Sequence, residues 1–142
     1  LIILGDGKER PKLQKLVDEL HLDRFVSMPG FIQNPFPYLK RATVFVVSSL
    51  YEGFSNALVE AMALGVPIVS TDCPYGPREI LDNGKFGTLV QPGDYKALAE
   101  AILFMLTHPT SPDDLISRAN YFSINKSIDN FFELLKGANL RG

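Results

Sequence analysis

The amino-acid sequence predicts an α/β domain in which helices cover both faces of a parallel sheet. Short runs of β-branched and apolar residues alternate with segments whose apolar residues recur at helical spacing, as in βαβ units. One run, Thr43–Val47, is β-branched or apolar on both alternating faces, which is typical of a strand covered on both sides. The chain has 142 residues, of which 46% are apolar, so it is long enough for one domain with its own core.

The first part of the chain contains two predicted strands and one long helix. A buried strand over Leu1–Leu4 leaves the core through a turn at Gly5-Asp6-Gly7. An amphipathic helix follows, because four apolar residues are spaced along one helical face: Leu13, Leu16, Val17 and Leu20. A second strand is expected over Arg24–Met28, closed by Pro29-Gly30, and a short helical turn over Tyr38–Arg41. Because the apolar strand at residue 1 has no lead-in, we expect the chain to be a fragment.

The rest of the chain continues the same alternation. Strands are expected over Thr43–Val47, Pro67–Thr71 and Gly87–Gln91. The helices are indicated by apolar residues at helical spacing: Ala57, Leu58, Ala61 and Met62, then Leu98, Ala101, Ile102 and Met105, and last Ile128, Phe131, Phe132 and Leu135. We therefore expect one domain over residues 1–137 and a disordered tail over residues 138–142.

Composition excludes several classes of function. The net charge is −2 and the pI is about 5.6, so no basic surface for nucleic acid or an anionic membrane is expected. The single cysteine, Cys73, cannot form an internal disulfide, and two distant histidines do not make a zinc site. The apolar runs are too short to span a membrane and the N-terminus has no signal-peptide pattern, so we expect a cytoplasmic protein.

Ligands of open parallel sheets bind beyond the carboxyl ends of the strands, so function is expected at the strand exits. The exit after the third predicted strand is the richest in polar and glycine residues. Gly53 allows its backbone to turn sharply or to approach a ligand closely. Ser55 or Asn56 can cap the next helix, whose first free N–H groups are then expected at Ala57 and Leu58. Such a helix start favours an anion, and phosphate is the expected ligand.

Two carboxylates flank this expected anion site. Glu52 precedes the turn, and Glu60 lies about 6 Å along the helix axis from Asn56. Because a carboxylate accepts two hydroxyl hydrogen bonds, each glutamate suits a vicinal diol such as a ribose or a hexose. The order of these groups matches a sugar–diphosphate–ribose molecule laid across the strand exits. Each also has a structural explanation that stays open: Glu60 as a solvated helix residue, Glu52 as a turn residue beside glycine.

An ordered string of motifs gives a more specific indication. Glu52-Gly53-Phe54 is followed by Glu60-Ala61-Met62-Ala63, with seven residues between the two glutamates. The string continues with Gly65-Val66-Pro67-Ile68-Val69, Gly76-Pro77-Arg78-Glu79-Ile80, Gly84, Gly87 and Pro92-Gly93-Asp94. This pattern resembles the donor half of the family 4 retaining glycosyltransferases, over nearly the entire chain.

The resemblance implies the GT-B architecture, in which two Rossmann-like domains face a cleft and the C-terminal one holds the nucleotide sugar. It implies that Glu52, the residue assigned to catalysis, contacts donor-sugar hydroxyls and that Glu60 binds the ribose. Ser55 stands where many members have a second glycine. The remaining implied contacts are those to the donor sugar and diphosphate, at Gly53, Phe54, Ser55, Asn56, Ala57 and Leu58, and those to the base, at Phe31, Ile32 and Asn34.

The resemblance also implies parts that precede this chain. The family uses an Arg and a Lys on loops before the strand at Leu1–Leu4, and an acceptor-binding domain before those loops. We therefore expect the donor domain of a longer enzyme, truncated at its N-terminus. Its substrates would be a nucleotide diphosphate hexose or N-acetylhexosamine and a glycan or lipid-linked acceptor, in bacterial surface polysaccharide synthesis.

Further expectations accompany this interpretation. No cofactor is expected, and no metal, since the sequence has no Asp-x-Asp motif. The chain binds no nucleic acid, and its partners are the nucleotide-sugar donor and the acceptor domain of the same protein. The parent enzyme is expected in the cytoplasm, peripheral at the inner face of the membrane. By itself the fragment is expected to be inactive.

Two alternatives from other classes stay open on the residues alone. A nucleotide-sugar epimerase of the same fold would place acid–base residues in both halves. A non-enzymatic flavodoxin-like receiver or nucleotide-binding module would need an acidic cluster at the first strand exit, where Gly5-Asp6-Gly7 offers one acid. The Gly53-Phe54 turn and the segment Gly76–Glu79 favour the transferase.

Overall fold

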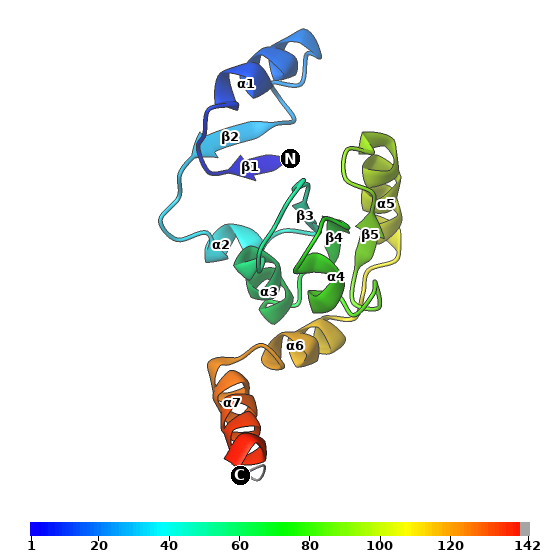
Figure 1. Cartoon of the computed structure of the whole chain (residues 1–142). Coiled ribbons are helices and arrows are strands. Elements are labelled where there is room, and N and C mark those ends of the chain that lie inside the picture. Colours follow the sequence, from blue (N-terminus) through cyan, green and yellow to red (C-terminus); the bar gives the residue numbers. More distant parts are fainter. Residues whose placement is uncertain (140–142) are drawn as a thin grey trace. The chain divides into compact units, whose positions relative to one another are not determined.

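The computed structural model describes residues 1–139 and divides into two compact units, Leu1–Tyr38 and the chain from Leu39 onward (Figure 1). The first unit has a two-stranded sheet, β1–β2, and the second a three-stranded sheet in the order β3-β4-β5. Every strand pair is parallel. The predicted α/β class with parallel strands is confirmed, although the strands form two sheets.

The first unit pairs β1 (Ile2–Leu4) with β2 (Ser27–Gly30), and α1 (Arg10–Glu19) connects them. The second strand lies further along than the predicted Arg24–Met28. The N–H groups of Phe25 and Val26 donate to the Leu22 carbonyl in a turn, while the Gly30 carbonyl accepts from Gly5 N–H at 2.9 Å. Because Phe25 and Val26 belong to this turn, β2 begins after them, at Ser27.

A short helix, α2 (Phe36–Leu39), begins two residues before the predicted Tyr38–Arg41. Asn34 Oδ1 accepts a hydrogen bond from the Phe36 N–H at 3.2 Å. Pro37 is compatible with this early start because its fixed φ suits the first helical turn. The side chain of Asn34 thus caps a helix.

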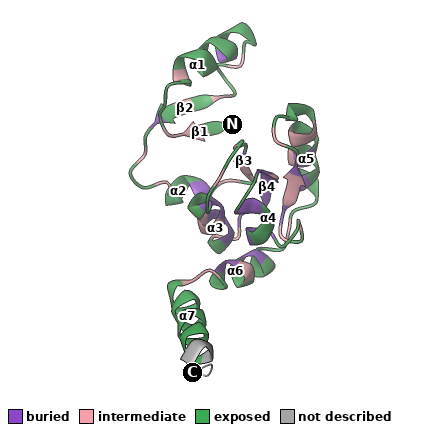
Figure 2. Cartoon of the chain, viewed as in Figure 1, coloured by how far each residue is buried: buried purple, intermediate pink, exposed green. Residues whose placement is uncertain are grey.

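The second unit is built around β4 (Ile68–Thr71), whose four residues are all buried (Figure 2). It pairs with β3 (Phe45–Val47) on one side and β5 (Thr88–Val90) on the other. Side chains of a strand alternate between its two faces. Ile68 packs into one hydrophobic cluster and Val69 into another, so both faces of this sheet are covered.

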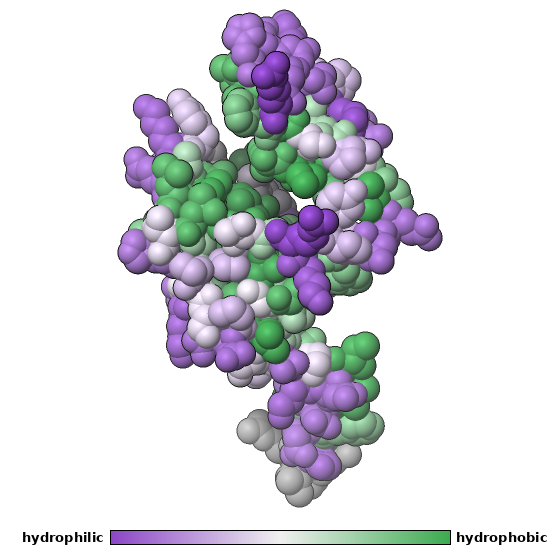
Figure 3. Space-filling model, turned by 180° about the vertical axis from the view of Figure 1, so that it is seen from behind, coloured by the Kyte–Doolittle hydropathy of each residue, from purple (hydrophilic) through white to green (hydrophobic). Residues whose placement is uncertain are grey.

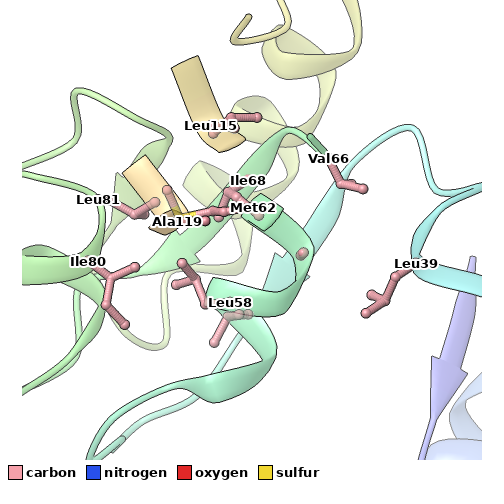
Figure 4. Close-up of a cluster of buried hydrophobic side chains, with 11 residues drawn as sticks. Leu39, Leu58, Met62, Val66, Ile68, Ile80, Leu81, Leu115 and Ala119 are labelled. Atoms are coloured by element: carbon pink, nitrogen blue, oxygen red, sulfur yellow. The ribbon is translucent and has the colours of Figure 1, made fainter. Parts of the chain in front are cut away.

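The larger cluster joins the sheet to α3 (Asn56–Ala63) and α6 (Pro112–Asn120) through Leu58, Met62, Ile68 and Leu115 (Figure 4). The smaller cluster joins it to α5 (Tyr95–Thr107) through Ala101 and Met105, which pack with Val69 and Val90. Helices on both faces of the sheet are therefore confirmed for the second unit.

Two helices in the second unit were not predicted from apolar spacing. One is α4 (Pro77–Ile80), a single turn, and the other is α6. The start of α6 carries signals that could have found it: Ser111 at the N-cap, Pro112 in the first turn, and the acidic Asp113 and Asp114. Its apolar stripe is too short to stand out, because Leu115 and Ala119 are its buried residues.

The last helix, α7 (Ile124–Asn139), carries exposed apolar side chains along one side (Figure 3), among them Ile128, Phe131 and Leu135. It extends through positions 138 and 139 of the tail that the sequence predicts, and the rest of that tail lies outside the described residues. Within residues 1–139, no helix combines the length and the hydropathy needed to cross a membrane.

Truncating Leu115 tests the packing of α6 on the sheet. Leu115 is fully buried, so Leu115→Ala leaves a cavity and should lower the free energy of unfolding by about 2–5 kcal/mol. Ile116 in the same helix is 38% exposed, and Ile116→Ala should cost less than about 1 kcal/mol. Urea denaturation of both variants measures the difference, and equal losses would contradict the packing described here.

Candidate functional site

The candidate site lies at the carboxyl ends of β3 and β4. These strands are parallel, with Val47 opposite Ser70, so the chain leaves both at the same edge of the sheet. The loop after β3 runs from Ser48 to Ser55 and leads into α3, and the loop after β4 leads through Gly76 into α4. The sequence-predicted residues between Glu52 and Glu60 therefore gather on one loop and one helix start.

The two loops pack backbone against backbone at Gly76. A β-carbon on this buried glycine would lie 2.7 Å from the Gly53 carbonyl oxygen and 3.5 Å from the Ser55 nitrogen. The φ of Gly76 is +84°, a conformation that L-residues with side chains rarely adopt. Both the space and the backbone conformation therefore require glycine at this position.

Gly53 differs from Gly76 in both respects. Its φ does not lie in the left-handed region, and a β-carbon there would meet no atom within 4 Å. The expectation that Gly53 permits a sharp turn is therefore not needed to explain the backbone. The open space beside Gly53 leaves room for close approach of a ligand, the second function predicted for it.

Glu52 is held by hydrogen bonds that begin in the sheet. The hydroxyl of Thr71, the last residue of β4, donates to the Ser49 carbonyl at 2.6 Å. The hydroxyl of Ser49 donates to Glu52 Oε1 at 2.7 Å. The half-buried Glu52 carboxylate is thus tied to the edge of the sheet, and its second oxygen has no partner among residues 1–139.

The first turn of α3 presents an unused backbone donor. Ser55 is the N-cap residue, but its hydroxyl does not cap the helix. The N–H groups of Leu58 and Val59 donate to the Ser55 carbonyl at 3.1 and 3.3 Å, and that of Asn56 donates to Phe54 at 3.1 Å. Within residues 1–139, the Ala57 N–H has no acceptor.

This arrangement corrects part of the sequence prediction for the helix start. A free N–H was expected at both Ala57 and Leu58, and the one at Leu58 is already bonded to the Ser55 carbonyl. The Leu58 side chain is also fully buried in the core. Ala57 therefore provides the free donor, because a 3₁₀-type bond at the first turn uses the N–H of Leu58.

Phe54 attaches the loop to the end of α6. Its ring centroid lies 5.6 Å from that of Phe122, just beyond this helix. Arg118 of α6 stands 4.9 Å from the centroid of the same Phe122 ring. The guanidinium also donates to the carbonyls of Ile80 and Glu79 at 2.9 and 2.6 Å, at the end of α4. One arginine therefore connects the supports of both loops.

Glu60 lies one turn into α3, on the side of the helix that also carries Asn56 and Ala57. The buried residues Leu58, Ala61 and Met62 form the other side. The carboxylate is half-buried, and among the side chains that the structure describes none forms an ion pair or hydrogen bond with it. A half-buried, unpaired carboxylate beside a free N–H is available to a ligand.

The three residues predicted to bind the base lie in the first unit, after β2. Phe31 is 78% exposed and Ile32 is half-buried. Asn34 is exposed and uses its Oδ1 to cap α2. The side-chain amide of Asn34 is thus partly committed to the fold, while the backbone at Ile32 stays a predicted base contact.

Comparison with known proteins identifies the family. Residues 1–108 match the family described as "Glycosyl transferases group 1". The chain belongs to this family of glycosyltransferases. The family predicted from the motif string is therefore confirmed.

Two relatives illustrate the match. An uncharacterised glycosyltransferase of Methanocaldococcus jannaschii is 46% identical over 105 aligned positions, and the match covers 65% of this chain and 26% of the relative. The N-acetylgalactosamine-N,N'-diacetylbacillosaminyl-diphospho-undecaprenol 4-alpha-N-acetylgalactosaminyltransferase of Campylobacter jejuni is 36% identical over 106 residues, 75% of this chain and 29% of the relative. The chain spans less than a third of the length of these curated relatives.

Solved structures agree with this assignment and with the GT-B fold. The apo form of the lipopolysaccharide outer core galactosyltransferase WaaB superposes with a TM-score of 0.86 at 26% identity, over 97% of this chain and 40% of that one. A mutant of Staphylococcus aureus TarM was solved with fondaparinux, alpha-GlcNAc-glycerol and UDP. It gives a TM-score of 0.80 at 25% identity, over 94% of this chain and 28% of that one.

Sequence reasoning missed three polar residues at this edge of the sheet. Ser49 and Thr71 hold Glu52, and Arg78 of α4 forms an ion pair with the mostly buried Asp72, with Nε 3.0 Å from Oδ1. Arg78 belongs to the motif Gly76–Ile80, but the sequence predicts no contact for its side chain. A serine three residues before a candidate glutamate is a weak signal that could have pointed to Ser49.

No cluster of three or more His, Cys, Asp or Glu side chains suited to a metal occurs within the described residues. This observation concerns protein ligands alone, whereas a nucleotide diphosphate can itself bring a metal ion. The expectation that the site needs no metal stays a prediction.

Paired glycine substitutions test the packing of the two loops. Gly76→Ala should lower the free energy of unfolding by about 2 kcal/mol or more, because the left-handed φ and the Gly53 carbonyl both oppose a β-carbon. Gly53→Ala should change it by less than about 0.5 kcal/mol, since its β-carbon projects into open space. Chemical denaturation separates the two, and a tolerated Gly76→Ala would contradict the described contact.

Proposed function

We propose that this chain is the donor-binding part of a retaining glycosyltransferase that uses a nucleoside diphosphate hexose or N-acetylhexosamine. The observation that carries the proposal is the start of α3, where the free N–H of Ala57 lies between the anchored Glu52 and the unpaired Glu60. A diphosphate between two hydroxyl-bearing rings supplies the complementary groups. The acceptor of the longer enzyme is a glycan or a lipid-linked glycan in bacterial surface polysaccharide synthesis.

The diphosphate binds at the start of α3. The aligned peptide dipoles of a helix place about half a positive charge at its N-terminus, and the Ala57 N–H can donate directly to a phosphate oxygen. The open space at Gly53 lets a phosphate approach the loop backbone without meeting a side chain. Phe54, Ser55, Asn56 and Leu58 shape this turn, with Leu58 anchoring it in the core.

The two glutamates bind the rings on either side of the diphosphate. Glu60 follows Ala57 by three residues on the same side of the helix, which suits the ribose attached to the diphosphate. Glu52 precedes the helix and binds hydroxyls of the transferred sugar, where it acts in catalysis. Each carboxylate can accept two hydrogen bonds from the hydroxyl groups of a diol. Phe31, Ile32 and Asn34 contact the base, with Ile32 using its backbone.

The reaction depends on positioning the donor and stabilising the leaving diphosphate as charge develops on it. Supporting the donor class, the TarM structure was solved with UDP. Supporting the acceptor class, the Campylobacter jejuni relative is named for a diphospho-undecaprenol substrate. The longer enzyme also supplies an Arg and a Lys for the diphosphate and a domain for the acceptor, at the cytoplasmic face of the membrane. No metal bound by this domain takes part.

Nucleotide titration tests the diphosphate site. The 142-residue chain should bind UDP in the millimolar range, because the two upstream cations contribute about 1.5–3 kcal/mol each to a bound diphosphate. Gly53→Ala should weaken binding by about tenfold through its β-carbon while the free energy of unfolding stays unchanged. NMR titration measures the affinities, and Ser117→Ala on α6 serves as an exposed control. Unchanged UDP affinity in Gly53→Ala would contradict the assigned phosphate position.

Steady-state kinetics of the longer enzyme separates the two glutamates. The ribose does not react, so Glu60→Gln should mainly raise the donor KM. Glu52 lies beside the bond that breaks, so Glu52→Gln should mainly lower kcat. Loss of one charge-assisted hydrogen bond corresponds to about 10- to 150-fold in either parameter. Glu100→Gln, an exposed carboxylate on α5, is the control, and reversed effects would mean that the donor lies in the opposite direction.

A further inference from the structure

The anchoring of Glu52 begins with a buried hydroxyl in the sheet. Thr71 is 3% exposed at the end of β4, and the Asp72 N–H that follows it donates to the Val90 carbonyl at 2.7 Å. The Thr71 hydroxyl lies 2.6 Å from the Ser49 carbonyl and 3.5 Å from that of Val47. The hydroxyl therefore donates its hydrogen bond to the Ser49 carbonyl, which fixes the loop to the neighbouring strand.

The Ser49 side chain transfers this constraint to Glu52. Its hydroxyl donates a hydrogen bond to the Glu52 carboxylate. The distance from Ser49 Oγ to Glu52 Oε1 is 2.7 Å, within the range of a charge-assisted O–H···O bond. A carboxylate has about four acceptor positions, so one bond from Ser49 leaves about three for hydroxyl groups of a ligand. Ser49 therefore orients the carboxylate without using up its capacity to bind a diol.

We infer that Ser49 is a positioning residue for Glu52 in recognition of the transferred sugar, and that Thr71 fixes Ser49 in place. This inference rests on the proposed function. Glutamate has three rotatable side-chain torsions, whose freedom is lost when it binds a ligand. Restricting them before the sugar arrives reduces the entropy cost of binding. The effect of Ser49 is therefore specific to the sugar and absent for the nucleotide alone.

A local structural role makes a different prediction. If the Ser49–Glu52 bond serves only to stabilise the turn, its loss moves the whole loop, including the backbone at Gly53 and the start of α3. Affinities for UDP and for a UDP-sugar then fall by the same factor. We call the dissociation constant of UDP divided by that of the UDP-sugar the sugar increment. This ratio therefore separates positioning from structural support.

The experiment measures this sugar increment in the 142-residue chain by NMR titration. The probes are UDP, UDP-glucose, UDP-galactose and their two N-acetylhexosamine counterparts, and the UDP-sugar bound most tightly by the unmodified chain is used throughout. The variants are Ser49→Ala, Ser49→Thr, Thr71→Val and Glu52→Gln. The matched control is Ser48→Ala, which removes the hydroxyl of the exposed neighbouring serine. Thermal melts and amide spectra confirm that each variant is folded.

We expect Ser49→Ala to reduce the sugar increment by about three- to tenfold while the UDP affinity changes by less than about twofold. Ser49→Thr retains a hydroxyl and should restore the increment, and Ser48→Ala should leave it unchanged. Thr71→Val should change it in the same direction as Ser49→Ala. The double variant Ser49→Ala/Glu52→Gln should be no worse than Glu52→Gln alone, because the two residues act through one carboxylate.

Two results would overturn the inference, and they differ in whether Glu52→Gln lowers the sugar increment. If Glu52→Gln lowers the increment while Ser49→Ala leaves it unchanged, or lowers UDP and UDP-sugar affinities equally, Ser49 has no positioning role and the proposed function stands. If the unmodified chain shows no sugar increment and Glu52→Gln changes nothing, the proposed donor site is wrong and the role of Ser49 is refuted with it.

Discussion

Close backbone packing between two loops determines the geometry of the candidate site. The loops begin at one edge of the sheet because β3 and β4 are parallel neighbours with Val47 opposite Ser70. Gly76 then brings the second loop so near the Gly53 carbonyl that no side chain fits between them. The shape of the Glu52 loop therefore depends on a residue more than twenty positions away. The same contact sets the position of the start of α3.

Polar groups at this edge divide into those bonded by the protein and those left for a ligand. Thr71 and Ser49 use their hydroxyl protons within the fold, whereas the Ala57 N–H and the Glu60 carboxylate have no partner among the described residues. Leaving such groups unpaired costs stability unless solvent or a ligand satisfies them. The pairing of a free donor with free acceptors suits a ligand that contains both phosphate and hydroxyl groups.

The sequence was sufficient for elements with long apolar patterns and for placing Glu52 on a loop and Glu60 on the helix after it, because both depend on neighbouring residues. It was not sufficient for α4, a single turn whose last carbonyls are bonded by Arg118 from 38 residues away. Nor could it show that the Leu58 N–H donates to the Ser55 carbonyl in the first turn of α3. The Thr71–Ser49 bond joins residues 22 positions apart and depends on the register of two strands. Apolar spacing carries no information about such register.

Support for the Glu52 loop comes from two directions within the second unit. On the sheet side, Thr71 holds the Ser49 carbonyl. On the helix side, Phe54 packs against Phe122, whose ring lies under the Arg118 guanidinium. The same guanidinium bonds the end of α4, the helix that follows Gly76, so both loops share one support. A loop without regular structure can hold a carboxylate in place when its two ends are fixed to different rigid elements. This explains how the chain combines an exposed Gly53, open to a ligand, with a Glu52 whose direction is already fixed.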